Sequence, residues 1–501
     1  MLRGLLLLAP AVLGLTMYLS GAEPPIADRR TRAARLYADG NYKEAYDVLK
    51  SLVLDPEHSG QPLADDFMQA VRCLQQLQQQ HEIDAFREAA VDAHADDWRL
   101  LARAAESLLG GEHYGFMVAG EFSRGQQRGG GQFVDATQRD RVRALQLLDQ
   151  ARPLADKDDD KIAVAQFYQQ LAGAVMYGRD GGEAWRLQAL TDLAELPDYD
   201  ESQPWRGRWG WGGGQGKGAP VDADGNPVLY TVPESWDAAT SDGQRWRWAL
   251  SMVGENNPDR RSAVNSTFAS FLHNQFGVQT MRHWGIVLPH GGPGSADDVD
   301  ESGPYALHSL GEDETIAKLA TGIKRFKLPD EFNPIRIWQS MAADENGGYA
   351  QGALSQLAQI FEDRQQYPRA AGYWKEIIDR FGDDRNKSRQ ARLDQIIGNW
   401  GHFESTHSQP AGQGAVVQYR FRNGRKLHLE AYALRVSQLL SDVQQYLKSN
   451  PQQLDWQQLQ IDNIGQRLVQ LDQTKYRGER VAAWDVELDP RPEHFDRRID
   501  V

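Results

Sequence analysis

Cysteine is almost absent from the sequence, and this limits how the fold can be stabilised. Cys73 is the only cysteine among 501 residues, so no disulfide bond can form within the chain. Cys73 also lies far from the amino terminus, which excludes a lipid-carrying cysteine directly after an export signal. A chain of this length can bury enough apolar surface to be stable through packing alone.

The sequence also lacks an excess of basic residues and lacks long apolar runs after its first 22 residues. Lysine and arginine total 55 against 70 aspartate and glutamate residues, a formal net charge of −15. Nucleic-acid-binding surfaces are basic, so we expect no nucleic-acid partner. A membrane-spanning helix needs about 18 or more apolar residues, and we expect none after the amino-terminal segment.

The first 22 residues have the features of an export signal. Arg3 provides a short basic region, residues 5–18 form an apolar run, and small residues at 20–22 precede Glu23. We therefore expect residues 1–22 to be a signal peptide and the protein to be exported, periplasmic or extracellular. An uncleaved anchor is the alternative, because basic residues close behind an apolar run oppose translocation. These residues are Arg29, Arg30, Arg32 and Arg35.

The clearest local pattern is a helix pair over residues 34–56. Residues 39–41 predict a turn, and the pattern resembles one tetratricopeptide repeat, which buries its apolar face by stacking on neighbours. Any antiparallel helix pair would share this pattern. The apolar residues at helical spacing are Tyr42, Ala45, Leu49 and Leu52. We expect helices to approach closely at Gly40, Ala45 and Ala371.

Together the segments predict a mostly α protein, an irregular tetratricopeptide-like α-solenoid followed by a small α+β unit. The expected parts are a helical-repeat array (23–200), a Gly/Trp-rich linker (201–233), a second helical-repeat array (234–400) and the α+β unit (401–501). Apolar periodicity predicts helices over 63–80, 139–154, 162–177 and 183–196, and helix pairs over 312–341 and 349–381. The expected packing residues include Trp236, Trp246, Trp248 and Leu250.

The α+β unit shows strand-like alternation on both sides of Asn423 and Gly424. Asn-Gly between alternating runs predicts a β-hairpin of residues 416–421 with 427–431. A helix is expected over 436–448. The final stretch, 481–501, is expected to be the opening strand of a larger β domain, without a partner strand.

Two short motifs partly match known functional sites, a thioester and a phosphate-binding loop, but neither match is complete. Cys73 and Gln76 have the spacing of an internal thioester, which needs a tight loop and an activated thiol, whereas the surrounding pattern predicts a packed helix cysteine. Gly216 and Lys217 suggest a phosphate-binding loop, but Gly218 stands where that motif requires serine or threonine.

Metal ligands are present without the spacing of a known site. No zinc spacing relates the histidines to the nearby acidic residues, which are His273, His283, His290, His308, Asp297, Asp298, Asp300 and Glu301. Residues 222–226 resemble the start of a calcium loop without its distal glutamate, and we expect a turn. We therefore predict no metal, no cofactor and no catalytic residues.

Aromatic and basic residues alternate within the Gly/Trp-rich linker and could stack on a sugar or a partner chain. A loop folded back on its own domain is the simpler interpretation. The residues are Trp205, Arg206, Arg208, Trp209 and Trp211.

Several stretches resemble the amino-terminal region of large bacterial α2-macroglobulin-like proteins. They are LGEDETI at 310–316, RFRNG at 420–424, YLKSNP at 446–451, LDW at 454–456, and DPRP and HFDRR within 489–498. Such proteins are protease traps with a cleavable bait segment and, in many members, a thioester. The resemblance reaches only the front of that architecture, so it transfers no site residue to this chain. It implies a leading scaffold, a truncated product or one half of a split system, with the α+β unit as the start of a macroglobulin-like β domain.

We therefore predict a non-catalytic, exported protein-interaction scaffold related to that leading region. The expected partners are proteins, among them β-sandwich domains of a macroglobulin-like protein. The alternative is an independent tetratricopeptide-type adaptor for envelope assembly. A hydrolase is the third hypothesis, because a Ser-His-Asp triad assembled from distant residues leaves no local pattern.

Overall fold

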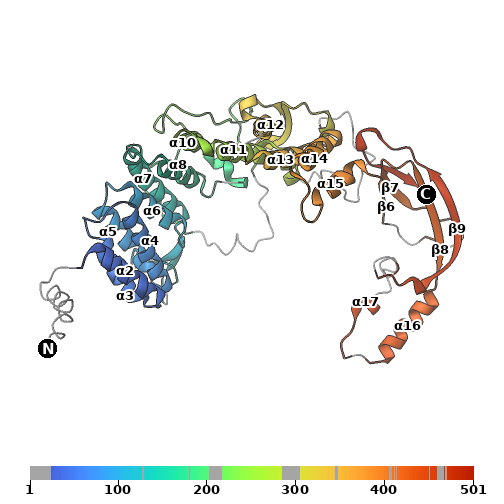
Figure 1. Ribbon diagram of the computed structural model, residues 1–501, viewed down its shortest axis with the longest axis horizontal. Coiled ribbons are helices and arrows are strands. Elements are labelled where there is room, and N and C mark those ends of the chain that lie inside the picture. Colours follow the sequence, from blue (N-terminus) through green and yellow to red (C-terminus); the bar gives the residue numbers. More distant parts are fainter. Residues whose placement is uncertain are drawn as a thin grey trace, which may run out of the picture. The chain divides into compact units, whose positions relative to one another are not determined.

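The protein is mostly helical with small antiparallel sheets, as the sequence predicts (Figure 1). The computed structural model describes residues 24–126, 129–179, 181–201, 217–284, 305–344, 348–405, 409–410, 412, 414–450, 452–459, 468 and 471–501. The predicted signal peptide and residues 202–216 of the Gly/Trp-rich linker lie outside these residues. Two compact units form, Met1–Val287 with Glu312–Met341, and Leu288–Gly311 with Ala342–Val501.

The first predicted helix pair is confirmed as α2 (Ile26–Ala38) and α3 (Tyr42–Val53). Helix α3 buries a stripe that includes Ala45, as helical spacing requires. The expected close approach at Gly40 is wrong, because an added Cβ would meet no atom within 4 Å. Gly40 has a φ of +80°, which glycine adopts at no steric cost, so the backbone of the turn is what favours glycine.

Further helices continue the first array and confirm the predictions over 63–80, 139–154 and 162–177. The side chain of Asp97 caps α6 by accepting from the backbone N–H groups of Arg99 and Leu100. Helix α6 packs on α7, and α8 packs on α10. The helices of this array are α4 (Gly60–Gln76), α5 (Gln80–Ala93), α6 (Trp98–Leu109), α7 (Thr137–Ala155) and α8 (Lys161–Met176), and α10 (Asp242–Asn256) lies in the segment predicted as the second array.

A three-stranded antiparallel sheet, which was not predicted, separates α6 from α7 in the chain. Strand β1 (Tyr114–Val118) lies between β2 (Glu121–Arg124) and β3 (Gln132–Asp135). The Arg124 guanidinium fastens the sheet to α7 by donating to both carboxylate oxygens of Asp140, at 2.7 and 2.8 Å.

The predicted helix over 183–196 is wrong. A 3-10 helix, η1 (Gly181–Gln188), forms instead, and the chain after it is not helical. The reason is tertiary: the N–H of Thr191 donates to the Asp242 carboxylate at 2.9 Å, and the N–H of Asp242 donates to the carbonyl of Ala189 at 2.9 Å. These long-range bonds take the place of helical ones.

The packing role predicted for the tryptophans is confirmed. Trp236 and Trp246 are buried, as is Leu250, and Trp248 is half-buried between the rings of Tyr168 and Trp236. Helix α10 leads through η2 (Pro258–Arg260) into α11 (Arg261–Phe276) and η3 (Val278–Trp284).

The first half of the predicted helix pair over 312–341 is wrong. Strands β4 (Glu314–Leu319) and β5 (Gly322–Lys327) form an antiparallel pair there, followed by η5 (Asp330–Phe332) and α12 (Pro334–Ala343). Gly322 has a φ of +121°, which suits a tight turn between strands. Ala219, just after the undescribed part of the linker, bridges Leu319 in parallel, so β4 receives a backbone neighbour that local periodicity cannot reveal.

The second unit contains the predicted helix pair over 349–381, confirmed as α13 (Ala350–Asp363) and α14 (Tyr367–Phe381). Ala370 and Ala371 are buried on α14. The 3-10 helix η4 (Leu307–Ser309) and helix α15 (Ser388–Ile397) also belong to this unit.

The predicted hairpin around Asn423 and Gly424 is wrong, because its two strands belong to different sheets. Strand β7 (Gln418–Arg422) has a neighbour on each side, β6 (Trp400–Phe403) and β10 (Arg497–Asp500), whereas β8 (Lys426–Leu434) pairs with β9 (Arg477–Glu487). The Asn423 amide donates to the carbonyls of Ile396 and Gly398 at 2.9 Å. Asn423 therefore binds the end of α15 and turns the chain from one sheet to the next.

The carboxy-terminal stretch is paired, which corrects the expected lone strand. Strand β9 pairs along its length with β8, and β10 pairs with β7. The predicted helix over 436–448 is confirmed as α16 (Val436–Lys448). The remaining elements are α17 (Trp456–Leu459), η6 (Thr474–Tyr476) and η7 (Pro492–His494). Within the described ranges, no helix has the length and apolarity needed to cross a membrane.

Candidate binding groove

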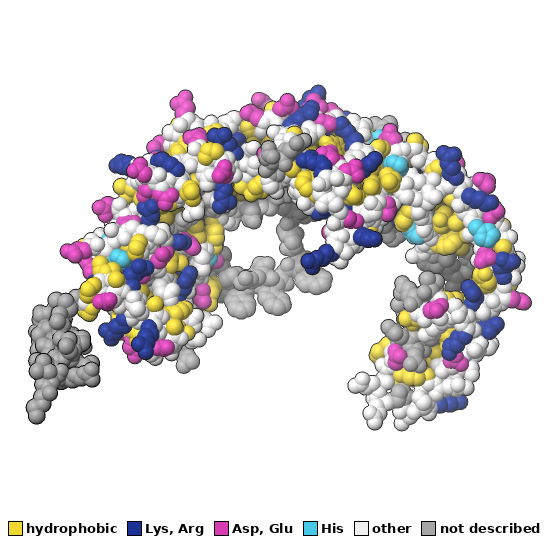
Figure 2. Space-filling model, in the orientation of Figure 1, with side chains coloured by type: hydrophobic (Ala, Val, Ile, Leu, Met, Phe, Trp, Pro, Cys, Tyr) yellow, Lys and Arg dark blue, Asp and Glu magenta, His cyan; other side chains and the backbone are white. Residues whose placement is uncertain are grey.

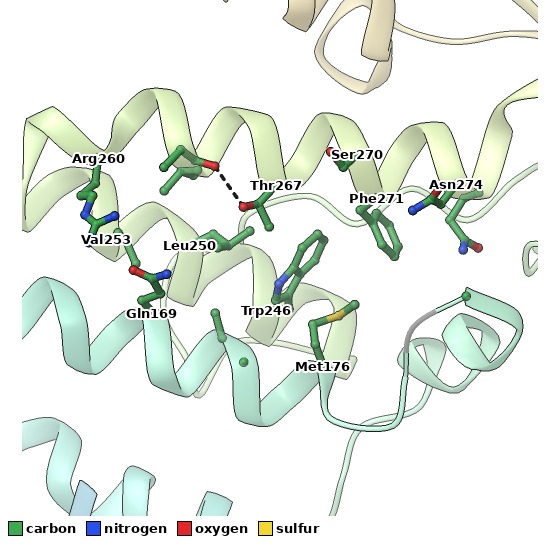
Figure 3. Close-up of a pocket in the computed structure, with 16 residues that line it drawn as sticks. Gln169, Met176, Trp246, Leu250, Val253, Arg260, Thr267, Ser270, Phe271 and Asn274 are labelled. Atoms are coloured by element: carbon green, nitrogen blue, oxygen red, sulfur yellow. Dashed lines mark hydrogen bonds between the residues drawn. The ribbon is translucent and has the colours of Figure 1, made fainter. Parts of the chain in front are cut away.

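A cavity of about 400 Å³ lies between α8, α10 and α11 in the first unit. Trp246 of α10, Phe271 of α11 and Met176 of α8 converge in it (Figure 3). The Trp246 and Phe271 ring centroids are 4.7 Å apart. Leu250 and Val253 extend this floor along α10, so the cavity offers an apolar, partly aromatic surface.

Polar side chains form the rim of this cavity. Thr267, Ser270 and Asn274 are exposed on one face of α11, and Gln169 is exposed on α8. Amide side chains both donate and accept hydrogen bonds. The rim can therefore bind peptide backbone while the floor takes an apolar side chain.

A second cavity of about 380 Å³ lies between α6 and α8. Trp98 and Arg99 of α6 line it, and both donate to the Asp158 carboxylate, at 3.0 and 2.6 Å. These bonds, Arg99 foremost, lower the pKa of Asp158 to about 2. The other lining residues include Gln61, Arg103, Glu106, Gln166, Phe167 and Gln170.

The two cavities share Gln169. On α8 the exposed residues Gln166, Gln169 and Gly173 recur at three- and four-residue steps, so they lie along one face. We call the two cavities together with this face the α8 groove. From Ala163 to Met176 the helix axis rises about 20 Å, the length of about six residues of extended chain.

The groove residues were mostly missed from sequence. Trp246 and Leu250 were predicted only as packing residues, and the glutamines of α8 were not singled out. The available signal was the polar stripe of Gln166 and Gln169 opposite the apolar face of α8, but such a stripe is also typical of an ordinary solvated helix face.

Cys73 is buried in α4, as predicted for a packed helix cysteine. Burial raises the pKa of its thiol to about 11. Gln76 is the last residue of the same helix, so neither residue lies in the tight loop that a thioester requires.

Those metal-ligand candidates that lie in the described residues do not come together. His273 packs on Trp338, and His308 packs on Phe495. His283 lies in η3, and the remaining candidates fall outside the described residues: His290, Asp297, Asp298, Asp300 and Glu301. Among the residues that are described, no three His, Cys, Asp or Glu side chains are grouped to hold a metal ion.

The other candidate motifs have structural explanations. The Nζ of Lys217 lies 3.9 Å from the centre of the Trp185 ring, and a Cβ on Gly218 would lie 2.3 Å from the backbone of Leu319. Residues 222–226 form the predicted turn, in which Asp222 accepts from the N–H groups of Asp224 and Asn226. Gly216 and the linker candidates Trp205, Arg206, Arg208, Trp209 and Trp211 lie outside the described residues.

The structure brings together a hydrogen-bonded chain of Asp140, His113 and Tyr177, which are too far apart in the sequence to form a local motif. His113 bonds to Asp140 through Nδ1, at 2.8 Å, and to the Tyr177 hydroxyl through Nε2. Burial raises the pKa of Tyr177, which keeps its hydroxyl protonated and disfavours a nucleophilic role. Asp140 is also paired with Arg124, so this hydrogen-bonded chain joins β2, α7 and the end of α8 as a structural network.

Surface charge is mixed in sign. On the face shown in Figure 2, basic and acidic side chains are interspersed over the described surface.

No protein-family model matches the chain, and no curated protein matches it in sequence. Among solved structures, the chain is similar to "Assembly Chaperone of RpL4 (Acl4) (Residues 1-338)", with 10% sequence identity and a TM-score of 0.26. The match covers 74% of this chain and 98% of that chain. A likeness this distant assigns no family.

Proposed function

We propose that the protein is a non-catalytic protein-interaction scaffold that holds an extended segment of a partner protein in the α8 groove. The observation that carries this proposal is that two cavities share Gln169 and run along one helix face. The apolar floor at Trp246 and Phe271 suits an apolar partner side chain, and the amides of the rim suit its backbone.

The groove can be blocked without disturbing the fold. Gly173 lines the groove on α8, and a Cβ there would meet no atom within 4 Å. Gly173→Trp should fill the groove while improving helix propensity, because glycine is a poor helix former. Gly352→Trp is the matched control, since Gly352 lies on α13 in the second unit with the same open surroundings.

The test is a selection of displayed random peptides on the full chain. Selected peptides should contain a recurrent apolar residue and should bind Gly173→Trp at least about tenfold more weakly than the wild type, the range expected for loss of a buried anchor. Binding to Gly352→Trp should be unchanged. Peptides that bind Gly173→Trp as well as they bind the wild type would contradict the groove as the site.

We further propose that this scaffold is exported and is related to the leading region of bacterial α2-macroglobulin-like proteins. The relationship is supported only by the short sequence stretches that resemble that region. The alternative remains an independent tetratricopeptide-type adaptor for envelope assembly. An open reading frame that continues downstream with β-sandwich repeats would favour the first proposal, and unrelated downstream sequence would favour the second.

The β8–β9 pair is the surface we assign to a β-sandwich partner in the first proposal. It is a two-stranded sheet, and such sheets are marginally stable alone. Trp484 and Val481 on β9 are 43% and 62% exposed. Trp484→Ser should weaken binding to such a partner, and unchanged binding would contradict this assignment.

The scaffold proposal also excludes protease trapping by this chain alone. The protein should not inhibit an endopeptidase acting on a protein substrate, even at stoichiometric excess. Stoichiometric inhibition in that assay would contradict the scaffold proposal and favour a complete protease trap.

A further inference from the structure

Three arginines surround one aspartate where α7, α8, η1 and α10 meet. Arg141 donates from Nη2 to Oδ2 of Asp242 at 2.8 Å. The Nε of Arg179 lies 3.9 Å from the same oxygen, and Nη1 of Arg245 lies 3.9 Å from Oδ1. The Asp242 side chain is 2% exposed. One buried carboxylate therefore faces three guanidinium groups.

Several donors of this cluster lack acceptors. Within the described part of the chain, no acceptor bonds Nε or Nη1 of Arg179, Nε of Arg141 or Nε of Arg245. Arg179 is 8% exposed, and its Nη2 donates to Gln138 at 3.3 Å. A buried charged donor without an acceptor is costly, and an ion or an ordered water is the usual explanation for such a group.

The segment that carries Arg179 has room beside it. Gly178 and Gly181 are exposed, with φ of +64° and +51°. A Cβ on either glycine would meet no atom within 4 Å. Gly178 and Gly181 therefore leave open space on the segment that carries the buried Arg179.

Further basic groups lie on or against η1, the 3-10 helix that begins two residues after Arg179. Arg186 of η1 is 41% exposed and pairs with Glu183 at 2.7 Å. Lys217 stacks on Trp185, whose indole Nε1 is another buried donor without an acceptor among the described residues. Indole N–H, guanidinium and ammonium groups are all donors only, so the set is suited to a ligand that only accepts.

We propose that this cluster, which we call the Arg179 site (Arg141, Arg179, Arg186 and Arg245), binds a small oxyanion, a carboxylate or a phosphate. The anion supplies acceptors to the unpaired N–H groups and balances the excess positive charge. Arg179 is the main donor, because among the described residues no acceptor bonds its Nε or Nη1, and its Nε lies 3.9 Å from Asp242. Gly181 also lines the α8 groove, but the proposal rests on the Arg179 donors and not on peptide binding in that groove.

The test is calorimetric titration of the full chain with inorganic phosphate and with acetate, at constant ionic strength in chloride. We expect saturable binding of one or both anions. Binding of phosphate alone identifies a phosphate site, and binding of acetate alone identifies a carboxylate site. Heats that do not saturate and are equal for both anions would mean an adventitious ion only and would overturn the proposal.

Arginine variants inside and outside the Arg179 site distinguish anion binding at that site from a general effect of net charge. Arg179→Gln should weaken binding by about tenfold or more, as expected for loss of a charge-assisted hydrogen bond. Arg186→Gln, at the exposed rim, should weaken it less and serves if Arg179→Gln does not fold. Arg143→Gln is the control, because Arg143 lies on α7 but pairs with Glu88. Equal affinity in Arg143→Gln and Arg186→Gln, with both below the wild type, would contradict the site.

A carboxylate of the chain itself could take the place of a bound anion at the Arg179 site, and a separate variant tests this. Asp180 follows Arg179 in the sequence and lies outside the described residues. If Asp180→Asn lowers the melting temperature and no anion binds the wild type, the chain provides its own anion and the proposal fails. If Asp180→Asn leaves anion affinity unchanged or tighter, the proposal stands.

Discussion

Arg141 of α7 and Asp242 of α10 form an ion pair at 2.8 Å, with side chains 0% and 2% exposed. They are separated by 101 positions in the sequence. The same aspartate accepts from the N–H of Thr191 and thereby fixes the chain after η1. One carboxylate therefore decides both how α7 meets α10 and why no α-helix forms over 183–196.

Removing this carboxylate should destabilise the protein strongly. Asp242→Asn leaves three arginines near an uncharged group, and breaking a buried pair costs about 3–5 kcal/mol. Asp237→Asn is the control, since Asp237 is 77% exposed and lies 3.5 Å from Arg152, a surface pair worth at most about 1 kcal/mol. Urea unfolding of both variants measures the difference. Equal effects would show that Asp242 does not hold the helices together.

The first repeat should not tolerate a large side chain in its core. Ala45 is fully buried on α3, so Ala45→Trp should lower the free energy of unfolding by roughly 1–3 kcal/mol through overpacking. Glu44→Trp, one position earlier and exposed, should change it little. A melting curve of Ala45→Trp that matches the wild type would contradict the repeat packing.

Cys73 should be unreactive in the folded protein. Burial raises the pKa of its thiol from 9.0 to about 11, and the thiolate is the reactive form. Labelling by iodoacetamide at pH 8 should be slow in buffer and fast in denaturant. Mass spectrometry should find no methylamine adduct at Gln76, and such an adduct would reveal a thioester and overturn the helix assignment.

Acid should remove the stability that Asp158 contributes. Its folded-state pKa is lowered to about 2, below the unfolded value of about 3.9. Its contribution is therefore fully present above about pH 4 and is lost as pH falls toward 2. The stability difference between wild type and Asp158→Asn should shrink over that window. A stability difference that does not depend on pH would refute the linkage.

Export should leave Glu23 as the first residue. The expectation rests on the apolar run of residues 5–18 and the small residues at 20–22. Amino-terminal sequencing of protein from the cell envelope or the medium provides the measurement. Recovery of Met1 from that fraction would contradict cleavage and favour an uncleaved anchor.

Local periodicity was enough to find the helices that bury one stripe. Tyr42–Val53, Lys161–Met176 and Val436–Lys448 are helices as predicted, because the spacing of their apolar residues specifies which face is buried. Missed elements such as β1–β3 are short, and their stability depends on Arg124 reaching Asp84 and Asp140.

The sequence by itself determined a mostly α chain with a separate α+β end, because amphipathic spacing and turn residues act over a few positions. Only the tertiary structure decided strand pairing and the groove. Asn423 and Gly424 do turn the chain, but β7 already has a neighbour on each side, so β8 pairs with β9 instead. The α8 groove arises where α6, α8, α10 and α11 leave space between them, and packing of distant helices is not encoded in any one local pattern.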